Sequence, residues 1–98
     1  MWNNKSLEVP ESPGENYICV LVQHVDYVYW AWTPIVGEEF EIMAKNIIDN
    51  WDNFLKTKDR DYQGTWYEYT IKKCGGDAIV TATPYRGEEV TFIFLNIN

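Results

Sequence analysis

Two apolar segments near the start of the chain have the pattern of neighbouring β-strands. Residues 17 to 23 read YICVLVQ and are apolar at odd and even positions alike, which is typical of a strand covered on both faces. Residues 27 to 33, YVYWAWT, are again aromatic and β-branched, and Pro34 closes the segment. Only the three residues His24, Val25 and Asp26 separate the segments, so we expect a β-hairpin.

The next segment has the spacing of an amphipathic helix. Glu38, Glu39 and Glu41 follow Gly37, and acidic residues in a first turn are stabilised by the positive end of the helix dipole. The apolar positions recur at intervals of three and four, which predicts one stripe packed in the core: Phe40, Met43, Ala44, Ile47, Ile48, Trp51, Phe54 and Leu55.

Three further strands are predicted after a loop over residues 59 to 64. Residues 66 to 74 alternate in polarity, Gly75 and Gly76 supply the backbone freedom of a tight hairpin, and residues 78 to 83 return. A turn over residues 84 to 87 leads to residues 90 to 97, VTFIFLNI, which are apolar at nearly every position. We therefore expect this last strand to lie inside the sheet.

The element order ββαβββ predicts an α+β two-layer sandwich, in which a single helix lies on one face of an antiparallel sheet of about five strands. Pairing the two strands that are apolar on both faces gives the spatial order 2-1-5-4-3, with every neighbour antiparallel. Residues 17 to 98 are enough for one core, so we expect a single domain there. Residues 1 to 16 lack periodicity and carry Pro10, Pro13 and Gly14, which indicates a flexible N-terminal arm.

One helix, about 10 Å wide, cannot cover a five-stranded sheet about 20 Å across. We expect the opposite face to remain open and the helix to lie over Ile18, Val20, Val22, Val28, Trp30, Trp32, Tyr69, Ile71, Val80, Ile93 and Leu95. An apolar patch of this size usually marks an interaction surface. Two alternatives stay open: the sheet curls strongly, or the N-terminal arm folds over the patch.

The net charge of −7 and the pI of about 4.5 argue against a basic surface for nucleic acid or an anionic membrane. We expect a neutral or basic partner; the charge serves solubility or mimics phosphate. No signal-peptide pattern and no membrane span is predicted, which favours the cytoplasm and free thiols at Cys19 and Cys74.

The sequence offers no constellation for catalysis, cofactor binding or metal binding. His24 is the only histidine, and it falls in the predicted hairpin turn, where a solvated side chain is the usual outcome. The acidic residues are spread over a helix start, a polar helix face and a turn, whereas a hydrolase needs two carboxylates that converge in a cleft. We therefore expect a protein that is not an enzyme.

We interpret the chain as a non-enzymatic protein-binding module that acts by stoichiometric occlusion, as a phage-encoded counter-defence inhibitor or a toxin-immunity protein would. The expected anchors are Tyr17, Leu21, Tyr27, Tyr29, Trp66, Phe92 and Phe94, and the residues expected to steer a partner are Glu38, Glu41, Asp49 and Asp52. A homodimer through the open face is also expected. The alternative is a small-ligand or nucleotide-binding domain, in which aromatic rings stack on the ligand at a dimer interface and Lys72, Lys73 and Arg86 neutralise a phosphate.

Overall fold

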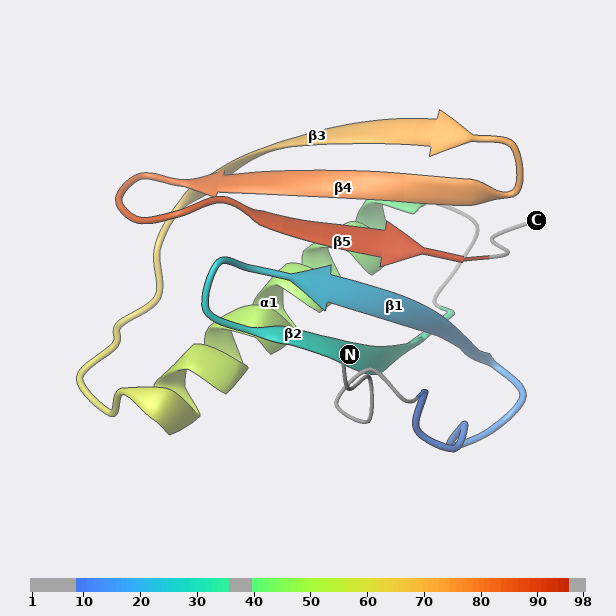
Figure 1. The fold of residues 1–98 in the computed structure, drawn as a ribbon, viewed down its shortest axis with the longest axis horizontal. Helices are drawn as coiled ribbons and strands as arrows, with labels where there is room; N and C mark the ends of the chain where they lie inside the picture. The colour runs from blue at the N-terminus through green and yellow to red at the C-terminus, as the bar shows by residue number, and fades with distance from the viewer. Residues whose placement is uncertain (1–8, 36–39, 96–98) are drawn as a thin grey trace, which may run out of the picture.

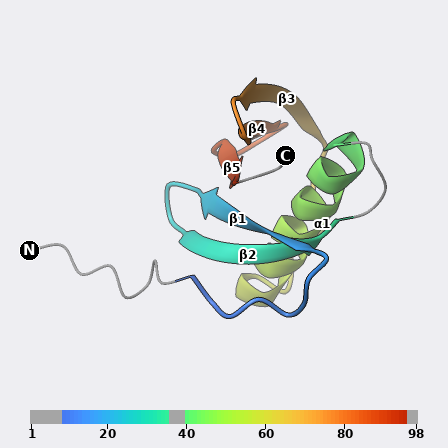
Figure 2. The ribbon, with the colours of Figure 1, turned by 90° about the vertical axis from the view of Figure 1, so that its right-hand side faces the viewer.

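The computed structural model of the protein describes residues 9 to 35 and 40 to 95. The elements along the chain are β1 (Tyr17–Gln23), β2 (Val28–Pro34), α1 (Phe40–Lys58), β3 (Tyr67–Cys74), β4 (Asp77–Pro84) and β5 (Val90–Phe94). The strands form one antiparallel sheet in the order β2-β1-β5-β4-β3 (Figure 1). Helix α1 lies on one side of this sheet (Figure 2). The predicted α+β fold class and strand order are confirmed.

The core lies between α1 and the sheet face that it covers. The predicted helix stripe is confirmed, because Ile47 and Trp51 are fully buried while Phe54 and Leu55 are partly buried at its end. The sheet contributes alternate residues of its central strands, such as Phe94, whose ring meets the Phe40 ring edge to face at 4.8 Å. Burial of these rings supplies most of the apolar area that stabilises the fold.

The β1–β2 hairpin differs from the prediction in the length of its loop. His24 and Tyr27 exchange backbone hydrogen bonds of 2.8 and 3.3 Å, so the loop contains only Val25 and Asp26. A loop that is shorter by one residue shifts the register by one, and this turns every side chain of β2 to the other face. Tyr29 therefore faces α1 and packs against Trp51, at 6.4 Å between ring centroids. The predicted placement of Val28, Trp30 and Trp32 under the helix was wrong.

The face assignment of β5 was also wrong. Phe94 pairs with Val20 and Phe92 with Val22, and all four side chains are buried beneath α1. Ile93 and Leu95 face the other way. The physical reason is that a strand that is apolar at nearly every position carries no alternation from which its inward face could be identified.

Candidate functional site

The sheet face that points away from α1 carries a continuous apolar surface. The strand register places Trp30 of β2 beside Leu21 of β1, Leu21 beside Ile93 of β5, and Ile93 beside Ile79 of β4. One apolar row therefore crosses four adjacent strands. A second row begins with Trp32 beside Cys19, whose carbonyl oxygen accepts a bond from the Leu95 amide. We call this surface the outer face and define it by Tyr17, Cys19, Leu21, Trp30, Trp32, Ile79, Ile93 and Leu95.

Polar residues border the outer face on one side. The neighbouring row begins with Val28 on β2 and is polar from there on, through Gln23, Thr91 and Thr81 to Thr70. Lys72 ends the apolar row on β3. An apolar centre with a polar rim is the usual anatomy of a protein interface.

The described part of the N-terminal segment meets the outer face at one corner. The Trp32 indole nitrogen Nε1 donates a hydrogen bond of 2.9 Å to the Pro10 carbonyl oxygen. Val9 lines a hollow of about 290 Å³ together with Trp30, Trp32 and Leu95. Val9 and Pro10 therefore contact the β2 edge of the outer face, while the helix lies on the opposite side of the sheet.

The structure separates the anchors predicted from sequence. Tyr17 and Leu21 lie on the outer face, whereas Phe92 and Phe94 are fully buried under α1. Tyr27 and Tyr29 also lie on the helix side, where their ring centroids are 5.1 and 4.8 Å, respectively, from that of Phe54. Trp66 is 70% exposed but lines a hollow with Ile48 and Asp49 of α1, so it too lies away from the outer face. The sequence reasoning missed Trp30 and Trp32, which the correct hairpin loop length would have placed there. It also missed Ile93 and Leu95, for which the nearly uniform apolar sequence of the last strand gave no signal.

The acidic residues predicted to steer a partner have different environments. Glu41 and Asp49 are exposed on α1, and therefore on the opposite side of the sheet from the outer face. Asp52 was expected on the solvated helix face, but its side chain is partly buried and hydrogen bonded to two tyrosines. Glu38 lies outside the described residues.

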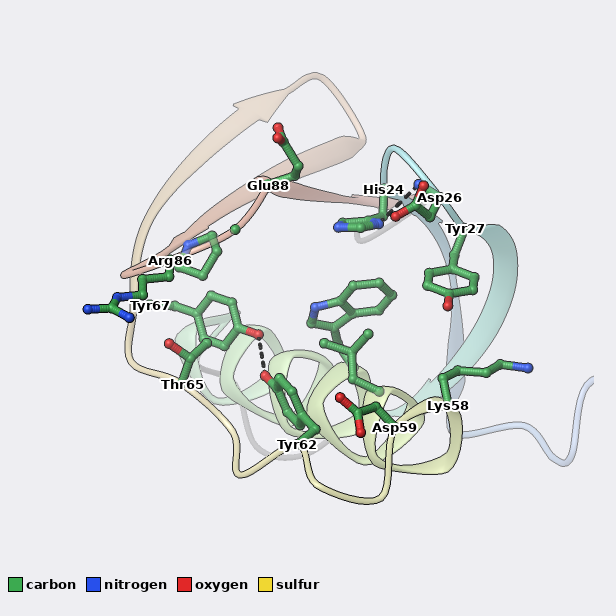
Figure 3. A pocket seen from close by; sticks show the side chains of 14 residues that line it. His24, Asp26, Tyr27, Lys58, Asp59, Tyr62, Thr65, Tyr67, Arg86 and Glu88 are labelled. Atoms are coloured by element: carbon green, nitrogen blue, oxygen red, sulfur yellow. Dashed lines mark hydrogen bonds between the residues drawn. The ribbon is translucent and has the colours of Figure 1, made fainter.

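A second hollow lies at the end of the sheet where the β1–β2 turn, the C-terminal half of α1 and the β4–β5 loop meet. It has a volume of about 350 Å³, within the range of about 300 to 1,000 Å³ that is usual for ligand pockets. We call it the hairpin-end cavity; its ring-bearing residues are His24, Tyr27, Trp51, Tyr62 and Tyr67 (Figure 3).

A hydrogen-bonded triad supports one wall of this cavity. Asp52 Oδ1 accepts bonds from the Tyr62 hydroxyl at 2.6 Å and from the Tyr67 hydroxyl at 2.7 Å. The two hydroxyl oxygens lie 3.1 Å apart. Burial and, to a smaller extent, the hydrogen bond to Asp52 raise the pKa of Tyr62 to about 12, and burial likewise raises the pKa of Tyr67. Both phenols therefore stay protonated at neutral pH.

His24 and Trp51 form the facing wall. The centroid of the His24 ring lies 5.0 Å from that of the Trp51 ring. His24 Nδ1 accepts a hydrogen bond of 3.1 Å from the Asp26 backbone amide. His24 is thus packed against the core, whereas the sequence reasoning expected a solvated turn residue. A neutral imidazole that accepts at Nδ1 carries its proton at Nε2.

Charged side chains surround the mouth of the cavity. Asp26, Asp59 and Glu88 contribute carboxylates, and Lys58 and Arg86 contribute cations. Both cations extend away from the cavity in Figure 3. Lys58 Nζ lies 5.2 Å from the Phe54 ring centroid and Arg86 Cζ 5.9 Å from that of Tyr85, and neither of these rings lines the cavity.

Three further observations concern the described residues alone. Cys19 and Cys74 are free, as predicted, and burial raises the pKa of the Cys19 thiol. No cluster of three or more His, Cys, Asp or Glu side chains in residues 9 to 35 and 40 to 95 is placed to hold a metal ion. The one helix in this part of the chain is not apolar enough over a sufficient length to cross a membrane.

Comparison of the chain with protein-family models, curated proteins and solved structures gives no match. Its function is therefore inferred from the outer face and the hairpin-end cavity.

Proposed function

We propose that the protein is a non-enzymatic binding module whose outer face occupies the surface of a partner protein in the cytoplasm. The observation that carries the proposal is the apolar row from Trp30 through Leu21 and Ile93 to Ile79, which lies on the side of the sheet opposite the helix. Apolar surfaces that cover several strands and lack a packed layer commonly mark protein interfaces.

The composition of the outer face suits a protein partner. Trp30 and Trp32 supply large rigid rings, which dominate binding energy at interfaces, whereas the threonine row lies in the rim, where contacts are usually close to neutral in energy. No catalytic group is required, because occupation of the partner's surface is itself the activity. Inhibition by one-to-one occlusion is the mode of action that this proposal assigns to the module.

The chain offers a matched pair of variants for the test. Ile79 and Thr81 lie on the same strand, face the same side and are both partly buried, but only Ile79 belongs to the apolar row. Ile79→Lys and Thr81→Lys therefore introduce the same charge at neighbouring positions on one face. Circular dichroism melts of both variants come first, and only folded variants are used in the comparison.

The proposed experiment is affinity capture from a lysate of the native host with the unmodified chain and with each variant. Mass spectrometry then identifies the captured proteins. We expect a protein that is retained by the unmodified chain and by Thr81→Lys but lost with Ile79→Lys. Titration calorimetry with that purified protein should show that Ile79→Lys weakens binding by about 2 kcal/mol or more, about 30-fold. Identical capture by all three chains would contradict the assignment of the outer face.

A second candidate function, small-ligand binding, is favoured by one observation. The hairpin-end cavity combines aromatic walls with a few polar groups, as ligand pockets usually do. A thermal-shift screen tests it, because a ligand that binds only the folded chain raises the unfolding midpoint.

A further inference from the structure

We propose that the hairpin-end cavity binds an organic cation, namely a guanidinium or substituted ammonium group on an apolar stem. The inference rests on the second candidate function, that this cavity is a ligand site, and it does not depend on the outer face. It is argued from the hydrogen-bonding character of one wall, the aromatic rings and the charges at the mouth.

The Tyr62–Tyr67 wall offers acceptors to a ligand and no donors. The two phenols have two hydroxyl protons between them, and the three contacts with Asp52 Oδ1 and with each other provide the places for those protons. Two protons fill two of the three contacts, and in each such arrangement both protons stay inside the triad, so only phenolic lone pairs remain available. A ligand that donates hydrogen bonds fits this wall, whereas a phosphate or carboxylate does not.

The aromatic rings favour a compact cation over a flat neutral ring. Trp51 is only 2% exposed, because Tyr29, Phe54 and His24 pack against its indole. It therefore has no open face on which a nucleobase could stack. Tyr27, Tyr62 and Tyr67 are only partly buried, and the negative face of such a ring attracts a cation within about 6 Å of its centroid.

The charges at the mouth also favour a cation. Lys58 and Arg86 lie over Phe54 and Tyr85 and extend away from the cavity, so neither fills it (Figure 3). Three carboxylates are also in the lining; the Glu88 side chain extends away like the two cations, which leaves those of Asp26 and Asp59 beside the cavity (Figure 3). The whole chain carries a net charge of −7, which adds long-range attraction for a positive ligand.

The first experiment is an amide NMR titration of the unmodified chain. The probes are Nα-acetyl-arginine methylamide, the corresponding lysine compound, the neutral norleucine compound and adenosine monophosphate. We expect the arginine compound to bind with a dissociation constant on the order of 1 mM and to shift the amides of Asp26, Tyr67 and Gly87. The norleucine compound should bind at least about fivefold more weakly.

Two results would overturn the proposal in different ways. Binding of adenosine monophosphate or norleucine at these amides as tightly as arginine would keep the cavity as a ligand site but remove its preference for cations. Absence of cavity shifts with every probe would remove the small-ligand candidate as well. Neither result bears on capture of a protein by the outer face, which the Ile79 and Thr81 variants test separately.

A second experiment uses two aspartates of one loop. Asp59 lines the cavity and Asp61 does not, and both are exposed. Asp59→Asn removes the charge but keeps the oxygen that accepts the Asp61 backbone amide at 3.0 Å. We expect Asp59→Asn to weaken arginine binding about threefold and Asp61→Asn to leave it unchanged. Equal weakening by both variants would show a general charge effect and would overturn the assignment to the cavity.

Discussion

Replacement of Trp51 by alanine tests the described core most directly. Trp51 is 2% exposed and contacts the rings of His24, Tyr29 and Phe54. Removal of about 200 Å² of buried ring at about 25 cal/mol per Å² gives about 5 kcal/mol. Residual compactness of the unfolded chain lowers this to about 3 to 4 kcal/mol, in line with typical losses for buried aromatic residues. We expect Trp51→Ala to reduce the free energy of unfolding by that amount.

The control is the same substitution at Trp66, whose side chain is 70% exposed. Trp66→Ala should cost less than about 0.5 kcal/mol, because an exposed ring loses little burial. Equilibrium urea denaturation, followed by far-ultraviolet circular dichroism, measures both values. A loss below about 1 kcal/mol for Trp51→Ala, or equal losses for the two variants, would refute the packing of α1 on the sheet described above.

Three further predictions concern association, thiols and alkaline pH. In the absence of a partner, sedimentation equilibrium should give about twice the 11.5 kDa chain mass. Trp30→Lys should return it to one chain mass, and Val28→Lys, at the border of the outer face on the same strand, should leave it doubled; a monomer for the unmodified chain contradicts this. A thiol reagent should modify exposed Cys74 faster than Cys19, because the raised pKa of Cys19 lowers its thiolate fraction. The intact mass measured without reductant should be that of a chain with two free thiols, whereas a mass lower by two hydrogens would indicate a disulfide. Burial raises the pKa of Tyr29 and Tyr62 to about 12, so the folded chain keeps two protons that the unfolded chain loses above about pH 10. The free energy of unfolding should therefore be steady up to about pH 10 and fall as the pH rises from there to about 12. Urea melts that are unchanged across this interval would exclude the effect.

The sequence was sufficient for the order of elements but not for the faces of two strands. The stripe from Phe40 to Trp51 has one period that only a helix satisfies, and the Gly75–Gly76 turn fixed the register of β3 and β4. In contrast, Val90–Phe94 is apolar on both parities, so nothing in its sequence distinguishes Phe92 from Ile93. For β2, a single residue of loop length decided which side faces the helix.

The hairpin-end cavity could not be predicted from periodicity. His24, Tyr62 and residues 86 to 88 come from turns and loops, and Asp52 looks like any other acidic residue on a polar helix face. Only the path of the chain after α1 brings Tyr62 and Tyr67 to Asp52. A pattern of side-chain types along the sequence carries no information about such a path.

The two edge strands of the sheet limit how copies of this chain can join. Strand β3 ends the sheet with exposed Glu68, Lys72 and Lys73, and β2 ends at Pro34, which has no amide proton to donate. Charges and proline on edge strands discourage the addition of a further strand. Continuous cross-chain sheets, and the fibrils that grow from them, are therefore disfavoured at both edges. Lys72→Val together with Lys73→Thr would remove this protection from β3 and should produce thioflavin-positive aggregates under conditions in which the unmodified chain stays clear.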